Sequence, residues 1–119
     1  MGYESKIVIV RKGHLTRDDG MRYASKLAEF TLGKVYGISD KIRTMPKTDC
    51  YYYADDGDTQ ITADRYGEAL AEITVTDLIK IIQDDMLDSD YYLYPILLAT
   101  LKEFKRFGDS RIVCLHYGY

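Results

Sequence analysis

The distribution of apolar positions predicts strands at both ends of the chain. Residues 3–11 and residues 111–117 place apolar side chains on both faces, which is typical of central strands, and we expect these two strands to lie side by side. The segment 21–35 fits one face of a helix as well as an alternating strand, and we interpret its residues 26–32 as a strand. The polar residues 12–20, which include two glycines, are expected to form a loop.

Two helices are predicted in the second half of the chain. Apolar residues recur at helical spacing over 75–87, after Thr74, which resembles a capping box together with the acidic residue three positions later. A second helix is expected to begin at 92–94, because Pro95 is tolerated in a first turn, and to end at Gly108. The buried stripe of this helix is expected to comprise Tyr94, Leu97, Leu98, Leu101 and Phe104.

These elements predict the α+β class. We expect about five mostly antiparallel strands with two helices packed on one face. A chain of 119 residues can bury one hydrophobic core, so a single α+β domain is expected over residues 1–119.

A β-hairpin is predicted over residues 50–63, where an Asp-Gly pair separates two alternating runs. A two-residue type I′ turn needs positive φ at both central positions. Gly57 adopts such a conformation freely and Asp56 tolerates it, so we expect a type I′ turn here.

That turn also fixes the register of the hairpin. It pairs Tyr53 with Gln60 and Tyr52 with Ile61. Because successive strand residues point to opposite faces, Tyr52 is expected to face the core, while Tyr51 and Tyr53 face outward.

Composition narrows the class of protein. The chain has the apolar and charged fractions of an ordinary globular protein, 46% and 29%, and contains no apolar run long enough to cross a membrane. Its first residues show no signal-peptide pattern, so a cytoplasmic location is expected. Cys50 and Cys114 are expected to be core residues, and we expect no metal site and no cofactor, because metal-ligand spacings and phosphate-binding loops are absent.

The charge is distributed unevenly along the sequence. Residues 55–90 carry two basic and eleven acidic side chains, whereas residues 1–54 carry ten basic and six acidic ones. Asp84, Asp85 and Asp88 lie at the C-terminal end of the first predicted helix, where the helix dipole disfavours negative charge. This departure from the stability rule indicates that the acidic segment serves a function.

Three stretches of the sequence resemble one group of proteins. They are MGYESK at residues 1–6, YADDGDTQITADRYG at residues 53–67 and LHYGY at residues 115–119. The chain resembles small uncharacterised proteins of phages and prophages of Gram-positive bacteria, closely in these stretches and loosely over its whole length. The resemblance implies, by analogy, binding to host components that include defence systems, and it implies no catalytic residues.

We therefore expect a non-enzymatic interaction protein that binds a host protein and inhibits or redirects it. An acidic surface with outward tyrosines suits a partner with a basic surface, such as a nucleic-acid channel, whereas direct binding to DNA is disfavoured by the overall acidity. The residues expected to contact the partner are Tyr51, Tyr53, Asp55, Asp56, Asp58, Asp84, Asp85 and Asp88. The sequence leaves homo-oligomerisation open.

Two alternatives remain open. The first is a protein that sequesters a nucleotide signal, with arginines on the phosphates and a tyrosine on the base; its candidate residues are Arg65, Tyr66, Arg106 and Arg111. The second is a phosphodiesterase that uses His14 and His116. His14-Leu15-Thr16 resembles half of a paired His-x-Thr signature, but Tyr117 and Gly118 follow His116, so the second half is missing and no catalytic residue is assigned.

Overall fold

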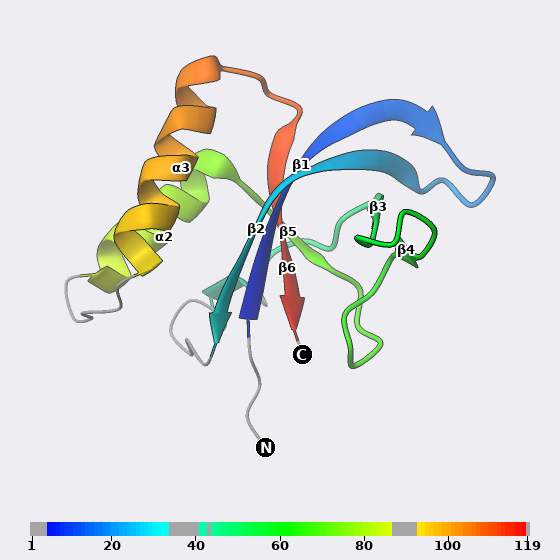
Figure 1. Ribbon diagram of the computed structural model, residues 1–119, viewed down its shortest axis with the longest axis horizontal. Helices are drawn as coiled ribbons and strands as arrows, with labels where there is room; N and C mark the ends of the chain where they lie inside the picture. The colour runs from blue at the N-terminus through cyan, green and yellow to red at the C-terminus, as the bar shows by residue number, and fades with distance from the viewer. Residues whose placement is uncertain (1–4, 34–40, 43, 87–92, 119) are drawn as a thin grey trace.

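A curved mixed sheet organises the molecule in the computed structural model, which describes residues 5–33, 41–42, 44–86 and 93–118 (Figure 1). The described residues form a six-stranded sheet of order β4-β3-β2-β1-β6-β5 and two long helices. The elements are β1 (Ser5–Thr16), β2 (Arg22–Gly33), β3 (Cys50–Tyr53), β4 (Gln60–Ile61), β5 (Ala71–Thr74), α2 (Val75–Met86), α3 (Leu93–Phe107) and β6 (Ile112–Gly118). The predicted α+β class is confirmed, with slightly more strands than expected.

β1 is the central strand, as predicted. It pairs antiparallel with β2 on one side and with β6 on the other, so the first and last strands of the chain lie side by side. β1 continues to Thr16, where a loop was expected over residues 12–20. The prediction failed there because polar residues can extend a strand that already has a partner. The tight turn that follows is closed by the Arg17 amide, which donates to the Met21 carbonyl at 2.8 Å.

The ambiguous segment 21–35 forms the strand β2, which confirms the strand interpretation. Its pairing with β1 shifts by one residue between Ile9 and Val10, so Leu27 is an extra, exposed residue in a β-bulge. The bulge turns the two halves of β2 to opposite faces of the sheet. Ala24 is therefore buried on one side of the sheet and Leu32 on the other. This change of face breaks the two-residue alternation and explains why the segment also resembled a helix.

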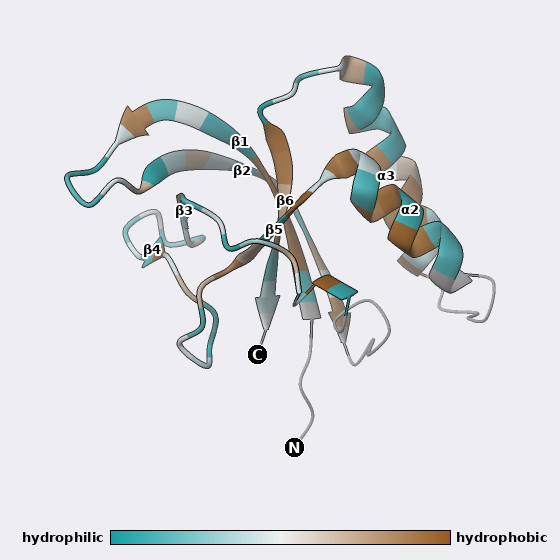
Figure 2. Cartoon of the chain, turned by 180° about the vertical axis from the view of Figure 1, so that it is seen from behind, coloured by the Kyte–Doolittle hydropathy of each residue, from teal (hydrophilic) through white to brown (hydrophobic). Residues whose placement is uncertain are grey.

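The helices cover one face of the sheet (Figures 1 and 2). Two clusters of buried side chains form the core, one on each side of the sheet. Ile7, Ile9 and Cys114 pack under the helices, whereas Val8 and Val10 point to the opposite side. The predicted burial of both cysteines is confirmed, and burial raises the pKa of the Cys114 thiol to about 12.

The sheet curls around the second cluster until its two edges nearly meet. Lys47 forms a β-bridge with Ala71 of β5, and the Thr48 amide donates to the Leu70 carbonyl at 2.8 Å. The same segment then enters β3, which pairs in parallel with the outer end of β2 through Cys50 and Tyr51. The buried members of this second cluster are Val8, Val10, Ala24, Cys50, Tyr52, Leu70, Val113 and Leu115.

The predicted start of the first helix and the predicted end of the second are confirmed. Thr74 Oγ1 accepts a hydrogen bond from the Asp77 amide at 3.1 Å, which is the expected N-cap of α2. Pro95 lies in the first turn of α3, and Gly108 follows the helix with φ of +71°. In the predicted stripe Tyr94, Leu97 and Leu101 are buried, whereas Leu98 and Phe104 are partly buried. No helix of the described ranges is both long enough and apolar enough to traverse a lipid bilayer.

Candidate functional site

The β3–β4 hairpin has the predicted register and a different turn. Tyr52 pairs with Ile61 and Tyr53 with Gln60, as expected. The type I′ turn is wrong: among the described residues only glycines have positive φ, so Asp56 does not adopt the conformation that this turn needs, whereas Gly57 does, with φ of +78°.

The Asp56 carboxylate holds the turn together. It accepts hydrogen bonds from the Asp58 amide at 2.8 Å, the Thr59 amide at 2.9 Å and the Thr59 hydroxyl at 2.6 Å. These bonds satisfy backbone donors of the turn and so replace a tighter two-residue turn. They also hold the pKa of Asp56 at about 2, with the Thr59 hydroxyl as the largest cause and the two amides next.

This arrangement predicts an acid-sensitive hairpin. The pKa of Asp56 in the folded state, about 2, lies below its ordinary value of 3.8, so its ionised form stabilises the fold above about pH 4, and this contribution is lost as the pH falls toward 2. Asp56→Ala is therefore expected to lower the melting temperature most at neutral pH, and the difference from the wild type should shrink below about pH 4. Thermal melts between pH 2 and pH 7 measure this, and a constant difference across that range would contradict it.

Three tyrosines from β2 and β3 form an aromatic cluster on the outer face of the sheet. The ring centroids of Tyr23 and Tyr51 lie 5.9 Å apart, those of Tyr51 and Tyr53 5.9 Å, and those of Tyr23 and Tyr53 5.8 Å. Such distances and tilted geometries are favourable for aromatic pairs. The parallel pairing of Tyr23 with Tyr51 brings the rings together.

Tyr51 lies on the predicted face but is only 7% exposed, so it is not the outward contact residue that was expected. The Arg17 guanidinium lies over its ring, 4.7 Å from the centroid, and the two neighbouring tyrosines cover its edges. Tyr53 is half-buried, and its hydroxyl accepts a hydrogen bond from Gln60 Nε2 at 3.2 Å.

Arg17 joins the turn between β1 and β2 to the β3–β4 hairpin. Its Nε donates to Asp19 at 3.2 Å, and its Nη1 donates to the side-chain carbonyl of Gln60 on β4. Both turns contain the sequence Asp-Asp-Gly, at residues 18–20 and 55–57, and both lie on the side of the molecule away from the helices (Figures 1 and 2). We call this surface the tyrosine–aspartate face; it comprises Arg17, Asp18, Asp19, Tyr23, Tyr51, Tyr53, Asp56, Asp58 and Gln60. Asp55, which was expected to contact the partner beside the tyrosines, lies instead with Lys26 and Tyr52 on the other side of the sheet.

The five carboxylates of the β1–β2 turn and the β3–β4 hairpin divide into two groups. Asp19 pairs with Arg17, Asp55 pairs with Lys26, and Asp56 closes its own turn. The hydrogen bonds to Arg17 and to Lys26 are the largest causes that lower the pKa values of Asp19 and Asp55. The second group is Asp18 and Asp58, both exposed, whose carboxylates have no hydrogen-bond or ion-pair partner in the described part of the chain. These two are free to meet another molecule.

The remaining acidic residues of the predicted surface lie elsewhere. Asp84 is exposed on α2, and α2 lies across the sheet from the β3–β4 hairpin (Figures 1 and 2). The side chain of Asp85 and the whole of Asp88 fall outside the described residues. The acidic segment 55–90 is therefore divided between two surfaces, and only its first part lies beside tyrosines.

The four residues proposed for a nucleotide ligand are not brought together. Arg65 and Tyr66 are exposed in the turn after β4, where the Arg65 amide donates to the Gly118 carbonyl at 3.1 Å. Arg106 pairs with Glu103 on α3 at 2.9 Å. Arg111 lies before β6.

The two histidines are likewise apart. His116 pairs with Ile7 on β1 and is 4% exposed, whereas His14 is exposed seven residues further along β1. Seven strand residues span roughly 23 Å, which is too far for an acid and a base to act on one bond.

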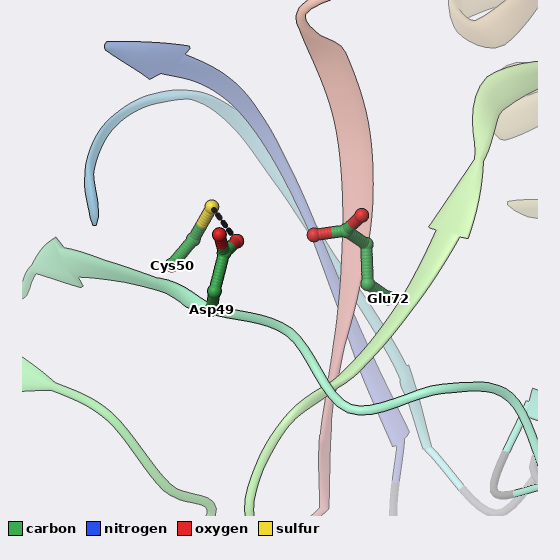
Figure 3. Close-up of side chains that lie close together, drawn as sticks. All are labelled: Asp49, Cys50 and Glu72. Atoms are coloured by element: carbon green, nitrogen blue, oxygen red, sulfur yellow. Dashed lines mark hydrogen bonds between the residues drawn. The ribbon is translucent and has the colours of Figure 1, made fainter. Parts of the chain in front are cut away.

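A separate group of polar side chains, Asp49, Cys50 and Glu72, lies on the side of the sheet away from the helices (Figure 3). Ligand atoms of Asp49, Cys50 and Glu72 lie within 4.8 Å of one another. The Lys12 ammonium already occupies this cluster, 2.9 Å from Glu72 and 3.5 Å from Asp49. Burial raises the pKa of the Cys50 thiol, which keeps it protonated and a poor metal ligand. We interpret this cluster as an internal ion pair.

The sequence interpretation missed Arg17, Asp18, Asp19 and Tyr23 because they lie in the net-basic first half of the chain. The repeated Asp-Asp-Gly motif was the one signal that could have connected the two turns. Comparisons with protein-family models, with curated proteins and with solved structures find no match to this chain, so its function has to be inferred from these surfaces.

Proposed function

We propose that this protein acts by binding a host protein through the tyrosine–aspartate face and thereby inhibits or redirects that protein. The observation that supports the proposal is the position of two exposed, unpaired carboxylates, Asp18 and Asp58, beside an aromatic cluster that Arg17 holds in place. Tyrosine and arginine are enriched in protein interfaces, and rim charges guide the encounter with a partner of opposite charge.

Internal bonds support a role in binding because they fix the surface in advance. Arg17 connects both turns, Gln60 is held between Arg17 and Tyr53, and Asp56 fixes its own hairpin. A surface ordered before contact loses less conformational entropy on binding. The chain therefore uses three of its five local carboxylates for order and presents two for recognition.

The chemistry of this face favours a partner with a basic surface. Carboxylates attract lysine and arginine side chains, and a tyrosine ring binds cations through its face. A basic groove that normally holds nucleic acid fits this description, and this agrees with the phage setting and the cytoplasmic location that we propose. Catalysis has no comparable support, because the two histidines are separated and one of them is buried.

Affinity capture from a Gram-positive bacterial lysate tests this function. Immobilised wild type is compared with a Tyr53→Ser variant, which removes a half-buried ring from the face, and with an Asp84→Asn control on α2. We expect a protein that the wild type and the control retain and the Tyr53→Ser variant loses. Retention of the same proteins by all three would contradict the proposed surface, provided that melting temperatures show each variant to be folded.

A further inference from the structure

Asp109 holds two arginines side by side at the end of the molecule where α3 leads into β6. Its carboxylate accepts a hydrogen bond from Arg11 Nε at 2.8 Å and from Arg111 Nε at 3.4 Å. The Arg111 amide donates to the same carboxylate at 3.0 Å, which fixes its orientation. One carboxylate thus positions two guanidinium groups, and the cluster keeps a net positive charge.

The ends of both guanidinium groups remain available. Arg11 and Arg111 have side chains that are 45% and 39% exposed. Asp109 engages each of them through Nε, and within the described residues the terminal nitrogens of Arg11 and Nη2 of Arg111 make no hydrogen bond. Nη1 of Arg111 lies 3.5 Å from His14 Nε2, so the imidazole adds a third nitrogen at the same place. Paired guanidinium groups match the oxygens of a phosphate.

A groove of about 300 Å³ adjoins this cluster. Asp109 itself lines the groove, and Arg11 shares a sheet face with its strand partner Ile112, another lining residue. The walls combine apolar side chains with a few polar ones, which is the usual composition of a small-molecule site. The lining residues are Thr74, Val75, Thr76, Phe104, Lys105, Gly108, Asp109, Ser110, Ile112 and Val113.

We propose that this end of the protein binds a small phosphorylated ligand of mononucleotide size. Its phosphate contacts Arg11 and Arg111, and its uncharged part lies in the groove beneath the α3–β6 connection. A volume of about 300 Å³ is at the lower end for ligand pockets, which favours a mononucleotide over a larger molecule. The net charge of −3 disfavours a polyanion such as single-stranded DNA. This proposal is independent of the tyrosine–aspartate face.

Isothermal titration calorimetry of the full chain tests the proposal with two probes, inorganic phosphate and ADP. We expect the wild type to bind both and to bind ADP more tightly. Arg111→Gln and Arg11→Gln should each weaken binding of both probes at least about tenfold, since each removes charge-assisted hydrogen bonds. Arg106→Gln, which changes an arginine paired on α3, is the matched control and should bind like the wild type. Thr76→Trp fills the groove, so it should weaken ADP binding and leave phosphate binding unchanged.

Several outcomes would overturn the proposal. If the wild type binds neither probe, the site is excluded. If both arginine variants bind the probes as tightly as the wild type does, Arg11 and Arg111 are excluded as phosphate ligands. ADP binding that Thr76→Trp leaves unchanged excludes the groove. Binding of a single-stranded oligonucleotide more tightly than ADP would show a nucleic-acid surface instead. Melting temperatures of all variants establish that each is folded.

Discussion

Changing Asp18 and Asp58 together to asparagine is expected to slow association with the basic partner about threefold to tenfold at low ionic strength. These two carboxylates have no internal partner within the described residues, so their loss removes attraction without removing a contact of the fold. The melting temperature should therefore stay unchanged. Surface plasmon resonance at two salt concentrations measures the effect, which should diminish as salt rises because exposed charges are screened.

The matched control is Asp84→Asn. It changes the same side-chain chemistry on α2, away from the tyrosine–aspartate face, and should leave the association rate at low salt unchanged. The double change removes two charges and the control removes one, so an equal effect per charge removed would mean that only net charge matters. No effect of the double change would show that the Asp-Asp-Gly turns are an ordinary solvated surface.

The second large effect concerns stability. Replacing Lys12 with methionine is expected to lower the free energy of unfolding by about 1–2 kcal/mol, because Glu72 and Asp49 lose the cation between them. Burial opposes the ammonium charge, yet the hydrogen bond to Glu72 and the nearby carboxylates raise the pKa of Lys12 overall. This loss is smaller than that for a fully buried ion pair, because water partly screens the charges of Lys12, Glu72 and Asp49.

A double-mutant cycle tests this interpretation by urea denaturation. Lys12→Met and Glu72→Met should each destabilise, and the double variant should be more stable than the sum of the two changes predicts, since neither charge is then left alone. Additive effects would show that the pair contributes nothing specific and that Lys12 acts only through packing of its alkyl chain.

The parts of the fold that could be predicted depend on local sequence. The helix caps at Thr74 and Gly108 have short-range signals, and the pairing of β1 with β6 follows from strands that are apolar on both faces. β5 was missed because it is only four residues long. Its sequence AEIT does alternate between apolar and polar positions, but so short a run is not distinctive. The contact that holds its Glu72 comes from Lys12, 60 positions away, which no local pattern indicates.

The candidate site was predictable only where its geometry is local. The Asp-Gly pair gave the register of the hairpin, but the side chain of Asp56 replaced the expected turn type by binding the amides itself. The aromatic cluster depends on the parallel pairing of Tyr23 with Tyr51, and the burial of the Tyr51 ring depends on the Arg17 guanidinium that lies over it. Both contacts join distant segments, so no periodicity indicates them.

Amide hydrogen exchange of this protein, alone and bound to its captured partner, tests the binding surface most directly. Slower exchange in the bound state is expected over residues 17–20 and 52–60, the two turns and the hairpin of the tyrosine–aspartate face. Exchange over residues 75–86 of α2 should be the same in both states. Protection confined to α2, with both Asp-Asp-Gly turns unchanged, would contradict the proposal that this face binds the partner.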